Sequence, residues 1–266
     1  MANVTFPVLQ PFEFEKLIDG VEVIETENKT WHHQLYYSIV YLVVIFNLRS
    51  YMKEKEAFEL KYLLAFWNFA MAFISIFATF RMLPGYLHVV WDFSMAFSIC
   101  DQNYGLQMNA SVFWGWLFKI LKNIEYGDTV FIVLRKRKLT FLHYYHHALT
   151  AIITAFAIGK RLPIGHGFIV ANYFVHSLMY TYYMLAALNI KIPKYCSMAL
   201  TSIQILQMLY GCFLCYMAFY FRAFRDDCRF PLRPIFIIIV MYVSYFFLFA
   251  RFFYVNYVCS KKNKKE

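Results

Sequence analysis

The stretch YLLAFWNFAMAFISIFATF (Tyr62–Phe80) contains 19 residues and no charged side chain. A helix of about 20 apolar residues is long enough to cross the hydrocarbon core of a bilayer. Two later runs, Phe168–Leu188 and Ser197–Phe221, have the same character. Only 16% of the chain is charged and 61% is apolar, whereas about a quarter of an average soluble domain is charged. The sequence therefore predicts an all-α integral membrane protein.

Seven stretches of the chain are apolar enough to be predicted spans, at 34–48, 62–80, 112–134, 139–158, 168–188, 197–221 and 235–258. The segment 83–100 is also apolar, but Pro84, Gly85, His88 and Asp92 interrupt it, and we expect an interfacial or re-entrant piece there. The chain is accordingly divided into an N-terminal segment (1–33), a seven-helix membrane domain (34–258) and a basic tail (259–266).

The net charge of +10 comes from basic residues that cluster in short connections between spans. Such clustering orients a membrane protein and does not indicate a nucleic-acid partner. Charge counting favours a lumenal N-terminus and a cytosolic C-terminus. Three sequons then fall on the lumenal side as glycosylation candidates, at Asn3, Asn28 and Asn109. The tail KKNKKE places Lys262 and Lys264 as in a dilysine retrieval signal, which predicts the endoplasmic reticulum membrane.

Two of the six cysteines, Cys100 and Cys228, fall in the two predicted lumenal loops. Because the lumen is oxidising, we expect a disulfide between them. The other four are expected to be free thiols, namely Cys196, Cys212, Cys215 and Cys259.

Four groups of polar residues recur at helical spacing in consecutive predicted spans, and ionisable residues inside a membrane are functional candidates. If each polar face turns inward, the groups surround one cavity with an active-site composition. Two blander interpretations stay open: Lys122 and Glu125 neutralise each other, and the last group joins helices. The groups are Lys122, Glu125, Asp128 and Thr129; His143, His146 and His147; Asn172, His176, Met179 and Tyr183; and Thr201, Gln204 and Gln207.

In order and spacing, these groups resemble the motifs of the very-long-chain fatty acid elongases, the 3-oxoacyl-CoA synthases of the endoplasmic reticulum. The motif K-x-x-E-x-x-D-T corresponds to residues 122–129, and the histidine box H-x-x-H-H to 143–147. The motif N-x-x-x-H-x-x-M-Y-x-Y-Y corresponds to 172–183, which adds Tyr180 and Tyr182, and T-x-x-Q-x-x-Q to 201–207.

The resemblance implies seven helices, six of them in two inverted three-helix units around a closed-ended acyl tunnel. It implies condensation of a long-chain acyl-CoA with malonyl-CoA to a 3-oxoacyl-CoA two carbons longer, with release of CO₂ and CoA. No bound cofactor is expected, and malonyl-CoA is the co-substrate. The implied partners are the bilayer, the reductase and dehydratase of the elongation cycle and a second copy of the chain. The context RKRKLTFLHYYHH resembles the subgroup for saturated and monounsaturated chains.

The resemblance also makes His146 the nucleophile, which would carry the acyl group as an acyl-imidazole, with His176 opposite it. His143 and His147 are expected to orient it, exchange protons or donate to an oxyanion, and the division of these roles stays open. Glu125 and Asp128 are expected to hold imidazole tautomers. Lys122 is expected near the cytosolic mouth, either meeting a CoA phosphate or neutralising Glu125. The remaining motif residues are expected to bind substrate or support the site.

Two other functions remain possible from the sequence. Membrane di-iron desaturases and hydroxylases also use H-x-x-H-H boxes, because imidazole is a good iron ligand. They need several such boxes, and four of this chain's 8 histidines fall in predicted lumenal segments: His32, His33, His88 and His166. No metal site is therefore expected. A seven-span transporter or receptor is the non-enzymatic alternative, and uptake of malonyl-derived carbon into a lengthened acyl chain would distinguish it.

Overall fold

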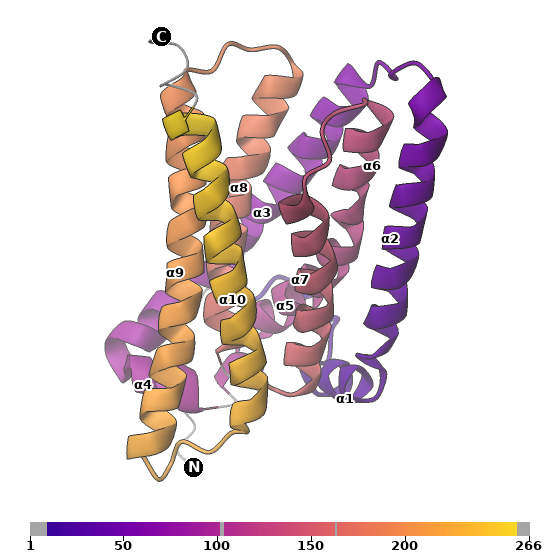
Figure 1. The fold of residues 1–266 in the computed structure, drawn as a ribbon. Helices are drawn as coiled ribbons and strands as arrows, with labels where there is room; N and C mark the ends of the chain where they lie inside the picture. Colours follow the sequence, from indigo (N-terminus) through magenta and orange to yellow (C-terminus); the bar gives the residue numbers. More distant parts are fainter. Residues whose placement is uncertain (1–9, 102–103, 163, 260–266) are drawn as a thin grey trace.

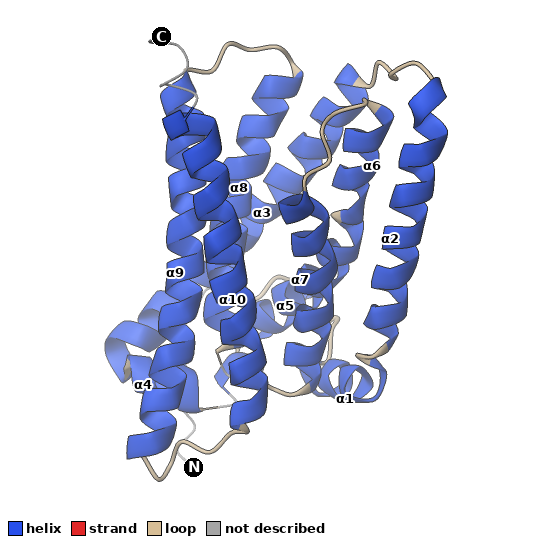
Figure 2. Ribbon diagram, viewed as in Figure 1, coloured by secondary structure: helices blue, strands red, loops and turns tan. Residues whose placement is uncertain are grey.

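The computed structural model describes residues 10–101, 104–162 and 164–259, and the regular structure within these ranges is entirely helical (Figures 1 and 2). The helices are α1 (Gly20–Thr30), α2 (His33–Tyr51), α3 (Lys61–His88), α4 (Met95–Cys100), α5 (Asn109–Ile124), α6 (Tyr126–Leu134), α7 (Phe141–Gly159), α8 (Gly165–Ala187), α9 (Lys194–Phe224) and α10 (Leu232–Phe253).

Four helices in the described part of the chain are long and apolar enough to cross a membrane, over 33–54, 61–93, 194–224 and 232–259. They contain α2, α3, α9 and α10 and confirm the helical membrane class. The other three predicted spans correspond to α7, α8 and the pair α5–α6. Helices α5 and α6 have only 16 and 9 residues, so neither is long enough to cross a membrane alone, and α7 and α8 carry polar motifs. The seven-span topology and the inverted repeats stay predictions.

One predicted boundary is wrong, because Pro84 does not end the helix that contains it. Helix α3 continues through Pro84 to His88, so residues 83–88 extend the span, and only the turn Val89–Phe93 and α4 fold back. The N-terminal segment holds α1, whose start is capped by Asp19 accepting from the Val21 amide at 2.8 Å. A side chain at Gly159 of α7 would contact the α1 backbone, so the two helices cross closely.

The predicted continuous helix over 112–134 is broken at Glu125, between α5 and α6. The Asp128 amide donates to the Glu125 carbonyl three residues back, at 3.1 Å, which tightens the chain into a turn. Gly127 lies directly against the Trp67 ring, where a Cβ atom would be 2.7 Å from the indole. The break changes the direction in which the K-x-x-E-x-x-D-T side chains point.

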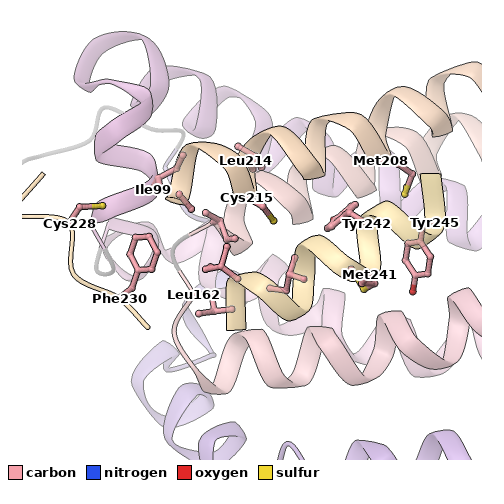
Figure 3. Packing of buried hydrophobic residues seen from close by; sticks show 14 residues of the cluster. Ile99, Leu162, Met208, Leu214, Cys215, Cys228, Phe230, Met241, Tyr242 and Tyr245 are labelled. Carbon is pink, nitrogen blue, oxygen red and sulfur yellow. The ribbon is translucent and has the colours of Figure 1, made fainter. Parts of the chain in front are cut away.

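The helices pack in two long pairs, α3 along α8 and α9 along α10, with α1 lying across the end of α7 (Figure 1). Figure 3 shows part of the core around α9 and α10, where the Tyr242 ring packs against α9 at Gly211. A disulfide joins Cys100 of α4 to Cys228 in the α9–α10 connection. The cysteines 196, 212, 215 and 259 are free.

Of the predicted glycosylation sites and retrieval lysines, the structure describes the side chain of Asn28. Asn28 is exposed on α1, where its Oδ1 accepts from Lys160 at 3.0 Å. Asn109 begins α5, but its side chain lies outside what the structure describes, as do Asn3, Lys262 and Lys264 altogether.

Candidate active site

A cavity of about 310 Å³ lies among α7, α8, α9 and the end of α10. All four predicted catalytic histidines line it. So do seven further motif residues, namely Asn172, Met179, Tyr182, Tyr183, Thr201, Gln204 and Gln207. Three motifs that are far apart in sequence therefore meet on one surface, as their helical spacing predicted.

The histidine box occupies the first turns of α7, directly after a capped start. The Thr140 side chain accepts from the His143 amide at 3.3 Å and fixes where the helix begins. The ring centroids of His143 and His147 are 4.4 Å apart, and those of His146 and His147 are 5.4 Å apart. His147 Nδ1 is buried and has no hydrogen-bond partner among the described residues. Three imidazole rings thus lie on one wall of the cavity. One ring nitrogen, Nδ1 of His147, makes no hydrogen bond to the described residues.

Lys122 is buried behind the cavity, at 2% exposure. The sequence predicts it near the cytosolic mouth, and the structure does not place it at an accessible opening. Its Nζ is 2.7 Å from Glu125 Oε1 and donates to Asn172 Oδ1 at 2.8 Å. A CoA phosphate has no access to an ammonium in this position. The structure therefore favours the interpretation in which Lys122 neutralises Glu125.

Glu125 also lies 3.3 Å from His176 Nδ1, through the same Oε1 that meets Lys122. A carboxylate at Nδ1 favours the tautomer that keeps the proton on Nδ1 and leaves Nε2 unprotonated. Glu125 thus lies within reach of the His176 imidazole, and its tautomer-holding role stays a prediction.

Asp128 does not hold a histidine in this structure. Its two carboxylate oxygens accept from the Trp67 indole N–H at 2.6 Å and from the Tyr180 hydroxyl at 2.7 Å. These bonds join α6 to α3 and α8. Because of the break at Glu125, Asp128 faces these helices and supports the site from outside the cavity.

Thr129 also lies outside the cavity, where it connects His143 to α2. Its Oγ1 is 2.9 Å from His143 Nε2 and 2.7 Å from the Tyr41 hydroxyl. A hydroxyl that accepts from Tyr41 can donate to the imidazole, so the chain of bonds fixes the His143 ring. Tyr41 was not predicted from the sequence.

Tyr245 of α10 is a second unpredicted neighbour of the histidines. Its ring centroid lies 5.0 Å from that of His146, and its hydroxyl donates to the His146 carbonyl at 3.2 Å. The same hydroxyl lies 3.0 Å from Thr150 Oγ1. It packs against the imidazole that the resemblance makes the nucleophile.

The fourth motif closes the cavity from α9. Thr201 lies 3.4 Å from the Tyr257 hydroxyl, between Oγ1 and OH, and Gln204 Nε2 lies 3.5 Å from Met179 Sδ. Gln207 is buried and lines the same surface. This group therefore combines the two predicted uses, because it joins helices and presents amides to the cavity.

A second cavity, of about 210 Å³, adjoins the first and is lined mainly by apolar side chains of α5, α7, α8 and α10. Asn172 lines both cavities. Within the described ranges, no three His, Cys, Asp or Glu side chains converge as metal ligands. The arrangement offers nucleophilic and proton-accepting imidazoles beside an apolar space.

Comparison with known proteins agrees with the motifs. The sequence profile of the ELO: GNS1/SUR4 family matches residues 26–265. The chain is 40% identical to very long chain fatty acid elongase 6 of Drosophila melanogaster, over 90% of this chain and 76% of that protein. It is 36% identical to very long chain fatty acid elongase 3 of Homo sapiens, over 97% of this chain and 94% of that protein. It is 35% identical to very long chain fatty acid elongase 6 of Gallus gallus, over 96% of each.

Proposed function

The chain belongs to the ELO (GNS1/SUR4) family, and we propose that it is the condensing enzyme of fatty acid elongation. It joins a long-chain acyl-CoA to malonyl-CoA and forms a 3-oxoacyl-CoA two carbons longer, CO₂ and CoA. The observation that carries the proposal is the convergence of four histidines on a cavity that shares Asn172 with an apolar one. The first cavity, lined by the histidines, suits acyl transfer, and the second, lined mainly by apolar side chains, suits a hydrocarbon chain.

In the first step, a neutral imidazole nitrogen of His146 attacks the thioester carbonyl of the acyl-CoA. The C–S bond breaks, and the proton lost from the imidazole goes to the departing CoA thiolate. The product is an acyl-imidazole, which splits one difficult transfer into two easier ones. Tyr245 supports this role because its ring and hydroxyl hold the turn that carries His146.

In the second step, malonyl-CoA loses CO₂, and the electron pair of the broken C–C bond forms an enolate. The enolate carbon attacks the acyl carbonyl and the C–N bond to His146 breaks. The departing His146 nitrogen then takes up a proton from solvent, which replaces the one that left with CoA. His176 is the group proposed to exchange these protons, because Glu125 leaves its Nε2 unprotonated. His143 and His147 complete the imidazole wall that stabilises the developing oxyanion.

The test is intact-protein and peptide mass spectrometry after incubation with acyl-CoA in the absence of malonyl-CoA. We expect a covalent acyl group on His146. His146→Ala should lose the adduct and lower kcat by at least about a thousandfold, as removal of other enzymatic nucleophiles does. His33→Ala is the matched control, because that histidine is exposed at the start of α2. Turnover at the wild-type rate by His146→Ala would contradict the nucleophile assignment.

The proposed location is the endoplasmic reticulum membrane, with the catalytic end of α7 toward the cytosol where malonyl-CoA is made available. The disulfide supports this orientation, because Cys100 and Cys228 need an oxidising compartment. Helix α4 and the α9–α10 connection, which carry these cysteines, lie at the opposite end of the bundle from the start of α7 (Figure 1).

A further inference from the structure

We infer that α1 is the floor of the apolar cavity, and that Val23, Ile24 and the two wall glycines Gly115 and Gly165 set the longest acyl chain the enzyme accepts. The inference rests on the proposed function, because it takes the apolar cavity as the place of the acyl chain. It adds a limit on length to that function, and it assigns the limit to named residues outside the four motifs.

The apolar cavity lies farther along α7 than the histidines and shares the lining residue Asn172 with their cavity. His146 lines the first cavity, and Thr150, Ile153, Ala157 and Ile158 line the second. The first four positions, from His146 to Ala157, follow one another at intervals of four, three and four residues, which keeps them on one side of the helix. An acyl group attached at His146 would therefore extend along α7 toward α1.

The charged side chains among the cavity's lining, Asp101 and Arg161, come from the segment after α4 and the end of α7. The α7 stretch from Thr150 to Ile158 presents apolar and hydroxyl side chains only. A hydrocarbon chain is thus accommodated along α7 and meets charge only where that helix ends.

Helix α1 closes this end as a fixed surface. Its residues Gly20, Val23 and Ile24 line the cavity. Lys119 of α5 pairs with Glu27 of α1 at 2.5 Å, between Nζ and Oε1. The close crossing of α1 over α7, described above at Gly159, holds the same helix from the other side. A helix anchored on two neighbours acts as a steric stop.

The wall glycines leave open space where other residues would fill it. A Cβ atom at Gly115 of α5 would have Ile169 Cδ1 as its nearest neighbour, at 3.9 Å. A Cβ atom at Gly165 of α8 would have no neighbour within 4 Å. Gly115 is seven residues before Lys122 on α5, which places it about 10 Å below the Lys122–Asn172 bond. A larger side chain here would cross the path of the acyl chain.

The length of α7 gives the expected limit. From His146 to Ile158 the helix rises about 18 Å, and from His146 to Arg161 about 22 Å. An extended hydrocarbon advances about 1.3 Å per carbon, given C–C bonds near 1.52 Å at tetrahedral angles. By this comparison the cavity accepts extended acyl chains of roughly 14 to 18 carbons.

The experiment measures kcat/KM of the full-length protein with malonyl-CoA and saturated acyl-CoA substrates across a series of chain lengths. For Gly115→Leu, we expect kcat/KM with the longest accepted substrates to fall by about tenfold or more, while short substrates stay near wild type. The double variant Val23→Ala/Ile24→Ala should shift the profile toward longer chains. Val21→Ala is the matched control on the same helix, because this side chain is 47% exposed and does not line the cavity.

Each outcome bears on one proposal. If the wild type lengthens no acyl-CoA of any length, the proposed function fails. If it does, and both variants keep the wild-type length profile, the α1 floor is overturned. If Gly115→Leu is inactive at every length, the Val23→Ala/Ile24→Ala variant decides, because it removes volume without adding any. In that case, an unchanged chain-length profile for Val23→Ala/Ile24→Ala is enough to overturn the inference.

Discussion

A lysine and a glutamate buried together behind the histidines show how single residues make this site possible. One unpaired charge in a low-dielectric interior costs several kcal/mol, whereas a paired and hydrogen-bonded charge is tolerated. Lys122 Nζ pairs with Glu125 and also donates a hydrogen bond to Asn172 Oδ1. The pair lets Glu125 stay ionised next to His176. The same glutamate is thus neutralised by one partner and orients the other.

Removing one member of this pair should therefore be worse than removing both. We expect Lys122→Met to destabilise the protein by about 3–5 kcal/mol, because it leaves a buried carboxylate uncompensated. The double variant Lys122→Met/Glu125→Met should recover much of the stability but not the condensation rate, because His176 then loses its acceptor. Thermal unfolding in detergent and turnover are the two measurements. A double variant less stable than the single one would contradict the pairing.

Tyr41 should act on His143 through Thr129. Tyr41→Phe removes the hydroxyl that lies 2.7 Å from Thr129 Oγ1, at a cost of about 1 kcal/mol or a few-fold in rate. We expect kcat to fall while KM for acyl-CoA stays unchanged, since Tyr41 does not line either cavity. Tyr36→Phe, on the exposed side of α2, should change neither constant. A change confined to KM would argue against a positioning role.

At the scale of helices, local periodicity predicted the faces of α7, α8 and α9, because each motif lies within one helix and spans only about one to three turns. It missed the break at Glu125, which depends on Gly127 packing against Trp67 of another helix. It also missed Tyr41 and Tyr245. Nothing in their spacing distinguishes them among 22 tyrosines. Contacts between distant segments, and not the pattern within one segment, decided these features.

The short helix Glu13–Lys16 is attached to α3 and α5 through Glu15. Arg81 donates to Glu15 Oε2 at 2.6 Å, and the Trp114 indole donates to Oε1 at 2.7 Å. Burial alone would raise the pKa of Glu15, but bonds from Arg81, Trp114 and the Phe12 amide hold it below the usual value. This segment packs against α5, which also contacts α1, so its attachment supports the elements around α1.

Glu15 should make stability depend on pH in one direction. Because its folded pKa lies below its unfolded pKa, its contribution is complete above about pH 5 and is lost as pH falls below about 4. We expect the wild type to lose thermal stability over that acidic range more than Glu15→Gln does, after Glu15→Gln has already lowered stability at neutral pH. Parallel unfolding curves for the two proteins at every pH would contradict this assignment.

In the whole molecule, helices surround the polar active-site residues and separate them from the lipid. Helices α7, α8 and α9 turn their motif side chains toward the cavity, whereas those of α5 and α6 are paired outside it. Large apolar side chains face outward from α3 and α10. Phe73 and Phe247 are examples, with exposures of 60% and 65%. Polar side chains inside a membrane are tolerated when they face the interior of the helix bundle. The resulting assembly has a polar end and a closed apolar end.

These two ends should lie on opposite sides of the membrane, and cysteine chemistry can test the orientation. Cys196, in the first turn of α9, is a free thiol at the polar end, whereas Cys100 and Cys228 are paired at the other. In sealed microsomes, a membrane-impermeant maleimide should label Cys196 and lose that label in Cys196→Ser. Cys100 and Cys228 should react only after both permeabilisation and reduction, because they are lumenal and oxidised. Labelling of Cys100 in sealed, unreduced vesicles would reverse the orientation and place α1 in the cytosol.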